Sequence, residues 1–456
     1  MNKPLWLTLC LGLVATLVLA DPPKRKENWV NLFNGKDLKG WKQLNGQAKY
    51  EVKDGEIIGT TVANTPNSFL ITEQDYGDFI LELELLADNS MNSGIQFRSL
   101  SKSDYQNGRV HGYQMEVDPS DRAWSGGIYD EARRDWLYIP NQNTEGKKAY
   151  KKGQWNKYRI EAIGPVLRTW VNDVPVAYLV DNLTPKGFIA LQVHSIGKTD
   201  QPGKQIRWRN VRIQTQNLQS RPTDGTPVVN LVPNTLSDQE KAQGFKLLFD
   251  GKTTEGWQPI FDPKAPLRRW EVQDGTLTVK KSDGSETGND IVYEKQYGPA
   301  FEFVFDFKFS EGGNSGVKYF VDKKYSPGGK SGIGLEYQVL DDDKHPDAKM
   351  GVNGNRTLGS LYDLMTSTKV DKRFQKKIGD WNMGKIIVYP DNRVEHWLNG
   401  YKVVEYVRGS PEFKELVAKS KYKGWDGFGQ AKQGYILLQD HGDAASYRSV
   451  KIRELK

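Results

Sequence analysis

The sequence predicts an all-β protein made of two tandem sandwiches, each with two antiparallel sheets packed face to face. Three observations carry this prediction. An ordered internal repeat covers nearly the whole chain, hydrophobic residues alternate with period two, and glycine, 45 of 456 residues, recurs in short turn steps such as Asn-Gly and Asp-Gly. Many short strands with one apolar face each are typical of stacked sheets.

The repeat is the strongest of these signals. LFNGKDLKGW at 32–41 recurs as LFDGKTTEGW at 248–257. Six further pairs follow in the same order: 50–55 with 270–275, 92–95 with 314–317, 127–130 with 360–363, 170–172 with 397–399, 187–194 with 434–441, and 209–213 with 448–452. Two long copies indicate a domain duplication, because a solenoid would show shorter periods and more of them.

The repeat sets the predicted boundaries. We expect a signal peptide at 1–20, a short linker at 21–28, a first domain at 29–215, a linker at 216–242 and a second domain at 243–456. Ser237 to Glu240 spells a capping box with Gly244 as a stop, which predicts one short helix in the second linker. A weaker helical pattern covers 411–420. Strands are predicted at 79–85 and 301–309, where alternation is clearest.

The first twenty residues are typical of an export signal. Lys3 precedes a Leu/Val-rich run that ends in Val18-Leu19-Ala20, a suitable cleavage site, and the run is too short for a membrane span. The only cysteine, Cys10, lacks a small residue before it and therefore makes no lipobox. We expect a periplasmic or secreted bacterial protein, with no stable membrane insertion after the signal is removed.

Charge and motifs exclude several functions. The net charge of +7 is spread along the chain instead of forming a basic stripe, so no nucleic acid is expected as a partner. No glycine-rich dinucleotide or phosphate loop and no serine-hydrolase elbow is present. The sequence does not assign an oligomeric state.

Strand alternation places polar side chains on one sheet face of the first copy. In 93–98, 112–118 and 188–194, apolar residues point one way and polar residues the other. The polar set is Gln96, Arg98, Gln114, Glu116, Asp118, Gln192 and His194, with Tyr129 in the next turn.

The second copy repeats this arrangement with Glu336, Gln338, Tyr362, Gln439 and His441. The Gln–Glu order is reversed there, and Phe320 replaces Arg98. An ordinary solvated face is the alternative explanation, but Glu/Gln pairs next to a Gln-x-His strand in both copies favour a site.

The ordered motifs resemble the DUF1080 family, also called the 3-keto-disaccharide hydrolase domain. The resemblance rests on LFNGKDLKGW, the NSG strand, GYQMEVD and GLEYQVLDDD, the (G/S)(I/L)YD turn, and the LQVH and LQDH strands, and it covers about 29–215 and 243–455. It implies two concanavalin A-like jelly rolls, export in bacteria, and a carbohydrate as substrate or ligand. The family's polar-face positions match Gln114, Glu116 and His194, and in the second copy Glu336, Gln338 and His441.

A 3-keto sugar has an acidic proton at C2, so a base can remove it and expel the C1 substituent. We expect Glu116 or His194 to serve as base and acid in the first copy, with Gln96, Arg98, Gln114, Asp118, Tyr129 and Gln192 binding substrate. In the second copy Glu336 and His441 take the catalytic roles, with Gln338, Tyr362 and Gln439 around them. If only one copy acts, Arg98 and the more acidic strand favour the first.

Three alternatives stay open. Glu116 and Asp118 could form the carboxylate pair of an ordinary glycosidase, although the second copy has Gln338 and Leu340 there. The tandem could also bind carbohydrate without cleaving it, as a lectin does. Asp341 and Asp343 are weak candidates for a divalent cation, the one cofactor left open, against a solvated turn.

Overall fold

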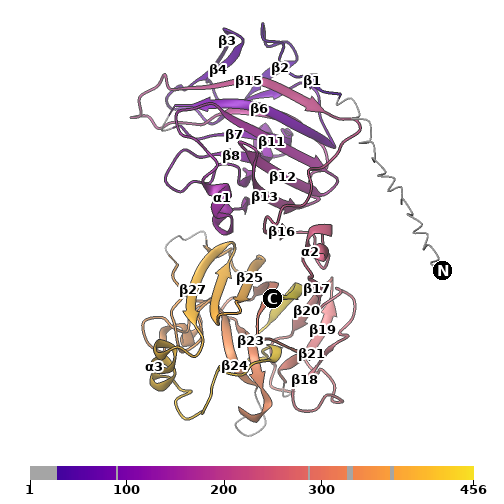
Figure 1. Ribbon diagram of the computed structural model, residues 1–456, viewed down its shortest axis with the longest axis vertical. Helices are drawn as coiled ribbons and strands as arrows, with labels where there is room; N and C mark the ends of the chain where they lie inside the picture. Colours follow the sequence, from indigo (N-terminus) through magenta and orange to yellow (C-terminus); the bar gives the residue numbers. More distant parts are fainter. Residues whose placement is uncertain (1–27, 89–90, 286–287, 326–331, 370–373) are drawn as a thin grey trace, which may run out of the picture.

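The computed structural model describes residues 28–456 except 89–90, 286–287, 326–331 and 370–373. The predicted leader with Cys10, and all but Asn28 of the predicted first linker, lie outside these ranges. Figure 1 shows two β-sandwich domains stacked along the long axis of the molecule. The predicted all-β tandem of jelly-roll sandwiches is confirmed.

Two sheets form the first domain within the described ranges. In spatial order, the larger sheet contains β16 (Val228–Asn230), β13 (Val174–Val180), β12 (Val166–Val171), β11 (Asn156–Ile163), β6 (Phe79–Ala87), β15 (Gln205–Gln214), β4 (Glu56–Thr60) and β3 (Lys49–Lys53), with β1 (Val30–Asn31) also beside β15. The smaller sheet contains β10 (Asp135–Tyr138), β9 (Ile128–Glu131), β8 (His111–Val117), β7 (Ser93–Leu100), β14 (Phe188–Val193), β5 (Ser68–Thr72) and β2 (Trp41–Leu44).

The second domain repeats this plan. Its larger sheet contains β19 (Trp270–Gln273), β20 (Thr276–Val279), β29 (Ala445–Glu454), β22 (Phe301–Phe309), β25 (Asn382–Val388), β26 (Arg393–Leu398) and β27 (Tyr401–Val407), with β17 (Lys246–Leu247) beside β29. Its smaller sheet contains β18 (Trp257–Pro259), β21 (Ile291–Tyr297), β28 (Gly434–Leu438), β23 (Asn314–Asp322) and β24 (Ile333–Leu340).

The period-two pattern decides which face each strand buries. On β22, Phe303, Phe305 and Phe307 are fully buried in the core between the two sheets of the second domain. Their neighbours Glu302 and Asp306 point to the other face, where they pair with Arg453 and Arg448 of β29. Burying one apolar face per sheet against its partner is the main stabilising contribution in each domain.

Helices are few and short in the described chain: α1 (Thr144–Lys147), α2 (Asp238–Ala242) and α3 (Pro411–Lys419), with 3-10 turns at Gln106–Gly108, Pro140–Gln142, Lys323–Tyr325 and Pro346–Lys349. α2 begins as predicted. Ser237 accepts from the backbone of Glu240, whose side chain accepts in return from the backbone of Ser237. α3 confirms the weaker helical pattern.

The segment predicted as the second linker is partly built into the first domain. β16 pairs in parallel with β13. The buried Arg168 guanidinium donates to the carbonyls of Arg221 and Pro222 and to the Asp224 carboxylate. The linker is therefore structured before it reaches α2.

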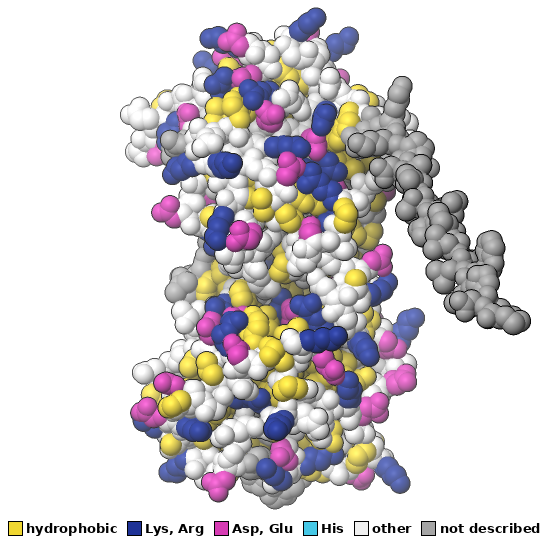
Figure 2. Space-filling model, viewed as in Figure 1, with side chains coloured by type: hydrophobic (Ala, Val, Ile, Leu, Met, Phe, Trp, Pro, Cys, Tyr) yellow, Lys and Arg dark blue, Asp and Glu magenta, His cyan; other side chains and the backbone are white. Residues whose placement is uncertain are grey.

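The surface carries both signs of charge. Figure 2 shows basic and acidic side chains interspersed over both domains, with hydrophobic side chains gathered just below the waist of the molecule. Among the described helices, none has the length and hydrophobicity needed to cross a bilayer.

Candidate functional site

Three adjacent strands of the smaller sheet build the polar face of the first domain. Glu116 of β8 lies opposite Gly94 of β7. On the other side of β7, Leu191 of β14 pairs with Ile95, so Gln192 lies beside Gly94. An added Cβ on Gly94 would lie 2.2 Å from Cδ of Gln114, which shows that this amide lies across the glycine. The missing side chain thus makes room for polar groups above the sheet.

Glu116 is the titratable centre of this face. Its Oε1 accepts from Asn92 Nδ2 at 2.6 Å, its Oε2 accepts from Gln114 Nε2 at 3.0 Å, and Arg122 lies 3.9 Å away. Only 4% of the residue is exposed. Burial raises the pKa of Glu116 to about 7, although the two amide donors oppose this shift. A carboxyl group with such a pKa can give or take a proton near neutral pH.

The glutamines form a relay that ends on Glu116. Ser99 Oγ donates to Gln96 Oε1, Gln96 Nε2 donates to Gln114 Oε1, and Gln114 then donates to Glu116. Gln192 is fully buried on the same face. Within the described chain neither atom of its amide has a hydrogen-bond partner. Buried amides of this kind usually have a partner, so Gln192 is available to a ligand or to water.

The other side chains predicted for this copy lie around Glu116 and Gln192, at the edge of the polar face. His194 is half-buried directly after β14, and its Nδ1 lies 2.8 Å from the Ser195 carbonyl. Tyr129, opposite Gln114, donates to Asp135. The Asp118 carboxylate already accepts hydrogen bonds from the turn that follows it. It accepts from Ser120 and from Arg122 Nε at 2.8 Å, and these donors lower its pKa although burial alone would raise it.

Arg98 lies elsewhere than strand alternation predicted. A register shift follows Phe97, Arg98 has a φ of 46°, and the side chain leaves the polar face. Its guanidinium is buried among Gly77, Asp78 and Gly164, with donor distances of 2.8 Å to each. Phe320 has the equivalent conformation, with a φ of 51°, so both copies keep this irregularity. A bulge changes which sheet face the following residues point to, and the alternation of apolar and polar residues does not reveal a bulge.

The second domain brings its predicted residues together. Gln338 lies opposite Gly316, Glu336 lies opposite Lys318, and the Gln439 backbone donates to the Gly316 carbonyl at 2.9 Å. These side chains line a pocket of about 110 Å³. One water needs roughly a tenth of that volume, so the pocket has room for part of a sugar ring.

All five predicted residues of this copy line the pocket: Glu336, Gln338, Tyr362, Gln439 and His441. Side chains that the sequence reasoning missed complete it: Lys318, Asp347, Lys421 and Tyr422, together with Asn314. Lys318 could have been found, since it alternates with the core residues Val317 and Tyr319. Lys421 and Tyr422 could not, because a segment without regular alternation carries them.

Glu336 is buried beside two basic side chains. Burial raises the pKa of Glu336, while the charges of Lys318, Lys421 and His441 act in the opposite direction. Lys318 Nζ lies 3.9 Å from Glu336 Oε2. In the described residues, Oε1 of Gln439 and Oδ1 of Asn314 are buried without a hydrogen-bond partner. Carboxylate, ammonium, imidazole and free amide oxygen therefore meet in one hollow.

An insertion in the second copy closes this pocket. The segment between β27 and β28 is much longer than its counterpart between β13 and β14, and it contains α3. Beyond α3, Lys421 Nζ lies 4.1 Å from the centre of the Tyr362 ring. The backbone of Lys421 donates to Asp363. The first copy has only a short loop at the same place, between β13 and β14.

The candidate cation ligands Asp341 and Asp343 belong to a turn after β24. Asp341 accepts from the backbone of Gly312, Asp343 and Lys344. Within the described ranges, no group of three or more acidic, histidine or cysteine side chains could hold a metal ion. A divalent cation at Asp341 and Asp343 stays a prediction.

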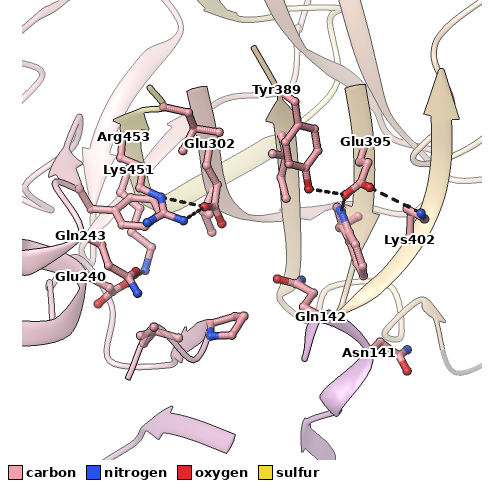
Figure 3. A pocket seen from close by; sticks show the side chains of 18 of the residues that line it. Asn141, Gln142, Glu240, Gln243, Glu302, Tyr389, Glu395, Lys402, Lys451 and Arg453 are labelled. Carbon is pink, nitrogen blue, oxygen red and sulfur yellow. Dashed lines mark hydrogen bonds and ion pairs between the residues drawn. The ribbon is translucent and has the colours of Figure 1, made fainter. Parts of the chain in front are cut away.

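A larger cavity of about 430 Å³ lies between the domains, on the back of the second domain's larger sheet. Figure 3 shows its acidic side chains paired: Glu302 with Arg453, and Glu395 with Lys402 and Tyr389. Lys451 pairs with Glu240 of α2. Across to the first domain, Lys385 Nζ donates to Gln142 Oε1 at 2.6 Å. The titratable groups of the two polar faces lie elsewhere.

The fold and the two faces define a class of proteins in which a β-sandwich presents buried carboxyl and amide groups on one sheet. Within it, the chain belongs to the 3-keto-alpha-glucoside-1,2-lyase-like domain family, which matches residues 28–214 and 244–453. This confirms the resemblance and the two tandem copies.

Parts of the chain are similar to known proteins. A 3-keto-disaccharide hydrolase from Bacteroides thetaiotaomicron is 33% identical over 236 residues, which cover 47% of this chain and 79% of that protein. A crystal structure from Parabacteroides distasonis, provisionally named a glycosyl hydrolase, is 31% identical, with a TM-score of 0.42, and covers 49% of this chain and all of that one. A carbohydrate-binding module from Bacillus subtilis is 16% identical, with a TM-score of 0.28, over 38% of this chain and 95% of that one.

Proposed function

We propose that this protein is an exported enzyme that cleaves 3-keto-glycosides, and that the pocket of the second domain is the cleavage site. Family membership and the name of the Bacteroides relative support the substrate class. The observation that carries the placement is that Glu336 and His441 line the same enclosed pocket. The signal peptide predicted at residues 1–20 supports the location.

The chemistry follows from the ketone at C3. A base removes the C2 proton, and the electron pair of that bond forms a C2–C3 double bond with negative charge on O3. When the charge returns to the ketone, a C1–C2 double bond forms and the C1–oxygen bond breaks. The leaving oxygen takes a proton, and water then adds to the unsaturated sugar.

Glu336 is the base in this proposal. Its raised pKa makes the carboxylate a stronger base than an exposed glutamate, and its burial keeps water from competing for the proton. His441 gives a proton to the leaving oxygen, because an imidazole can carry that proton near neutral pH. Gln338, Gln439 and Tyr362 bind the sugar hydroxyls.

The earlier preference for the first copy depended on Arg98 and Asp118. The structure removes Arg98 from the face and ties Asp118 to Ser120 and Arg122. Both reasons for favouring the first domain are therefore lost, and the pocket that Glu336 and His441 share supports the second.

The test compares a 3-keto-disaccharide with its unoxidised parent, using the full chain and two matched variants. We expect release of sugar from the keto form alone. Glu336→Gln should lower kcat by about 10²-fold or more, since a general base contributes roughly that much. Glu116→Gln, the matched change in the first copy, should leave most of the activity. The reverse ranking of the two variants would move the site to the first domain.

A second candidate function applies to the first domain. On its polar face the buried amide of Gln192 has no partner within the described chain, which favours carbohydrate binding without cleavage. Calorimetric titration of an unreactive disaccharide into the Glu336→Gln variant tests this. Remaining binding that disappears with Gln192→Leu supports the idea, and binding unchanged by Gln192→Leu contradicts it.

A further inference from the structure

Lys318 distinguishes the second polar face from the first. It lies two residues after Gly316 on β23, opposite Glu336 of β24. The equivalent residue of the first copy, two after Gly94 and opposite Gln114, is the neutral Gln96. Since the repeat holds the backbone alike, the two domains differ here by one positive charge on the same face.

The ammonium of Lys318 is held in place and points into the pocket. The residue is 3% exposed, and Nζ donates to the Gly332 carbonyl at 3.0 Å. Glu336 Oε2 lies farther away, at 3.9 Å, which is too long for a strong hydrogen bond. An ammonium has three donors, so at least one N–H remains for another acceptor in the pocket.

A second ammonium reaches the same pocket from the insertion. Lys421 lines it beside Tyr362 and Tyr422. The charges of both lysines act on the Glu336 carboxyl. Asp347 also lines the pocket, but its carboxylate is paired with Arg356 at 2.8 Å. Lys318 and Lys421 can therefore both act on an oxygen that becomes negative in the pocket.

We propose that Lys318 is a catalytic residue that holds the negative charge on O3 when the C2 proton has moved to Glu336. This inference rests on the function proposed above. In that step the C2–H bond breaks, the proton passes to the Glu336 carboxylate, and the electron pair becomes charge on O3. Lys318 keeps its proton throughout and donates a hydrogen bond to O3. Lys421 adds a second positive charge from the insertion.

The negative charge that Lys318 would hold develops only during the reaction. The substrate ketone is neutral, whereas the oxygen becomes anionic only as the proton leaves. A fixed ammonium therefore stabilises the transition state more than the bound substrate, and its effect should appear in kcat more than in KM.

The test uses Lys318→Gln in the full chain. This change gives the second copy the residue that the first copy already accommodates at the same place. We expect kcat on a 3-keto-disaccharide to fall by about 10²–10³-fold with KM changed less than about threefold. The kinetic isotope effect of a C2-deuterated substrate should rise, because proton removal becomes more strongly rate-limiting.

Matched controls separate this role from a structural one. Lys295→Gln makes the same change at an exposed position on β21 of the same sheet and should leave kcat unchanged. Circular dichroism and the melting temperature of Lys318→Gln should match the parent. Lys421→Met should lower kcat by a smaller factor. If Lys318→Gln does not fold, kcat and the isotope effect of Lys421→Met test the proposal instead. An unchanged kcat in Lys421→Met would contradict charge stabilisation by the two ammonium groups.

Two further results would contradict the role of Lys318 while leaving the proposed function intact. In one, Glu336→Gln is inactive but Lys318→Gln keeps its kcat or loses only affinity. In the other, borohydride traps a substrate adduct on Lys318, which would mean covalent chemistry instead of charge stabilisation. Full activity of Glu336→Gln would contradict the proposed function itself.

Discussion

Gly316 and Gly94 occupy the centre of the two polar faces, and each leaves space that a neighbouring polar group fills. An added Cβ at Gly316 would lie 2.3 Å from Glu336 Oε1 and 3.1 Å from Gln439 Oε1. Such a contact is too short, so the carboxyl group must move. The glycine therefore fixes the position of the proposed base.

Gly316→Ala should lower kcat/KM on a 3-keto-disaccharide by about 10²-fold, because displacing a reacting group by about 1 Å can have that effect. Steady-state kinetics measure it. Gly94→Ala, which would displace Gln114 of the first copy, is the matched control and should leave cleavage intact. Equal losses from both changes would argue that the glycines support folding only.

The raised pKa of Glu116 gives the first domain a pH-dependent stability. Because the pKa rises from 4.5 in the unfolded chain to about 7 when folded, the native state binds the proton more tightly. Its contribution is fully present below about pH 4.5 and is lost as the pH rises through 7. Over that range the free energy of unfolding should fall by roughly 3 kcal/mol from this group.

Glu116→Gln mimics the protonated carboxyl and should remove this component of the pH dependence. Urea unfolding at pH 5 and pH 8 measures it, and Glu73→Gln on the surface is the control. A pH dependence that is the same in Glu116→Gln and the parent would show that burial does not raise this pKa in solution.

At the scale of elements, alternation was a good guide to strands and to their polar sides. It located Glu116, Gln114, Glu336 and Gln338, since a side-chain period of two holds along an uninterrupted strand. It misplaced Arg98 because a bulge at Phe97 changes the facing, and a bulge leaves no trace in hydrophobicity. It missed the pocket wall of Lys421 and Tyr422 because tertiary packing decides the path of an insertion.

Phe413 of α3 is one of the buried aromatic side chains that anchor that insertion. The ring is 1% exposed and stacks on Tyr406 with 5.6 Å between ring centres. Phe413→Ala should lower the free energy of unfolding of the second domain by about 3 kcal/mol, and it should raise KM because the wall bearing Lys421 loosens. Urea unfolding and kinetics measure both.

Glu415→Ala on the exposed side of α3 is the matched control and should change stability by less than about 0.5 kcal/mol. A Phe413→Ala protein with normal KM would show that the insertion does not shape the substrate site.

At the scale of the molecule, the residues that fold together as the first domain extend beyond the end predicted from the repeat. A fragment ending at residue 215 loses β16 and the partners of the buried Arg168, whereas one ending at 231 keeps them. We expect the shorter fragment to be less stable by about 3 kcal/mol, since a buried charge loses its partners. Thermal unfolding of the two fragments checks this, and equal stability would show that 216–231 is a passive connector.

The short span between β16 and α2 has a consequence for long substrates. β16 is fixed to the first sheet, and Glu240 of α2 is fixed to Lys451 of the second domain, so little chain is free between them. A short tether gives a second binding event an effective concentration in the millimolar range. A glycan long enough to reach both faces would meet the second at that concentration, so chain length alone should raise turnover even when the sugar at the cleavage point is the same.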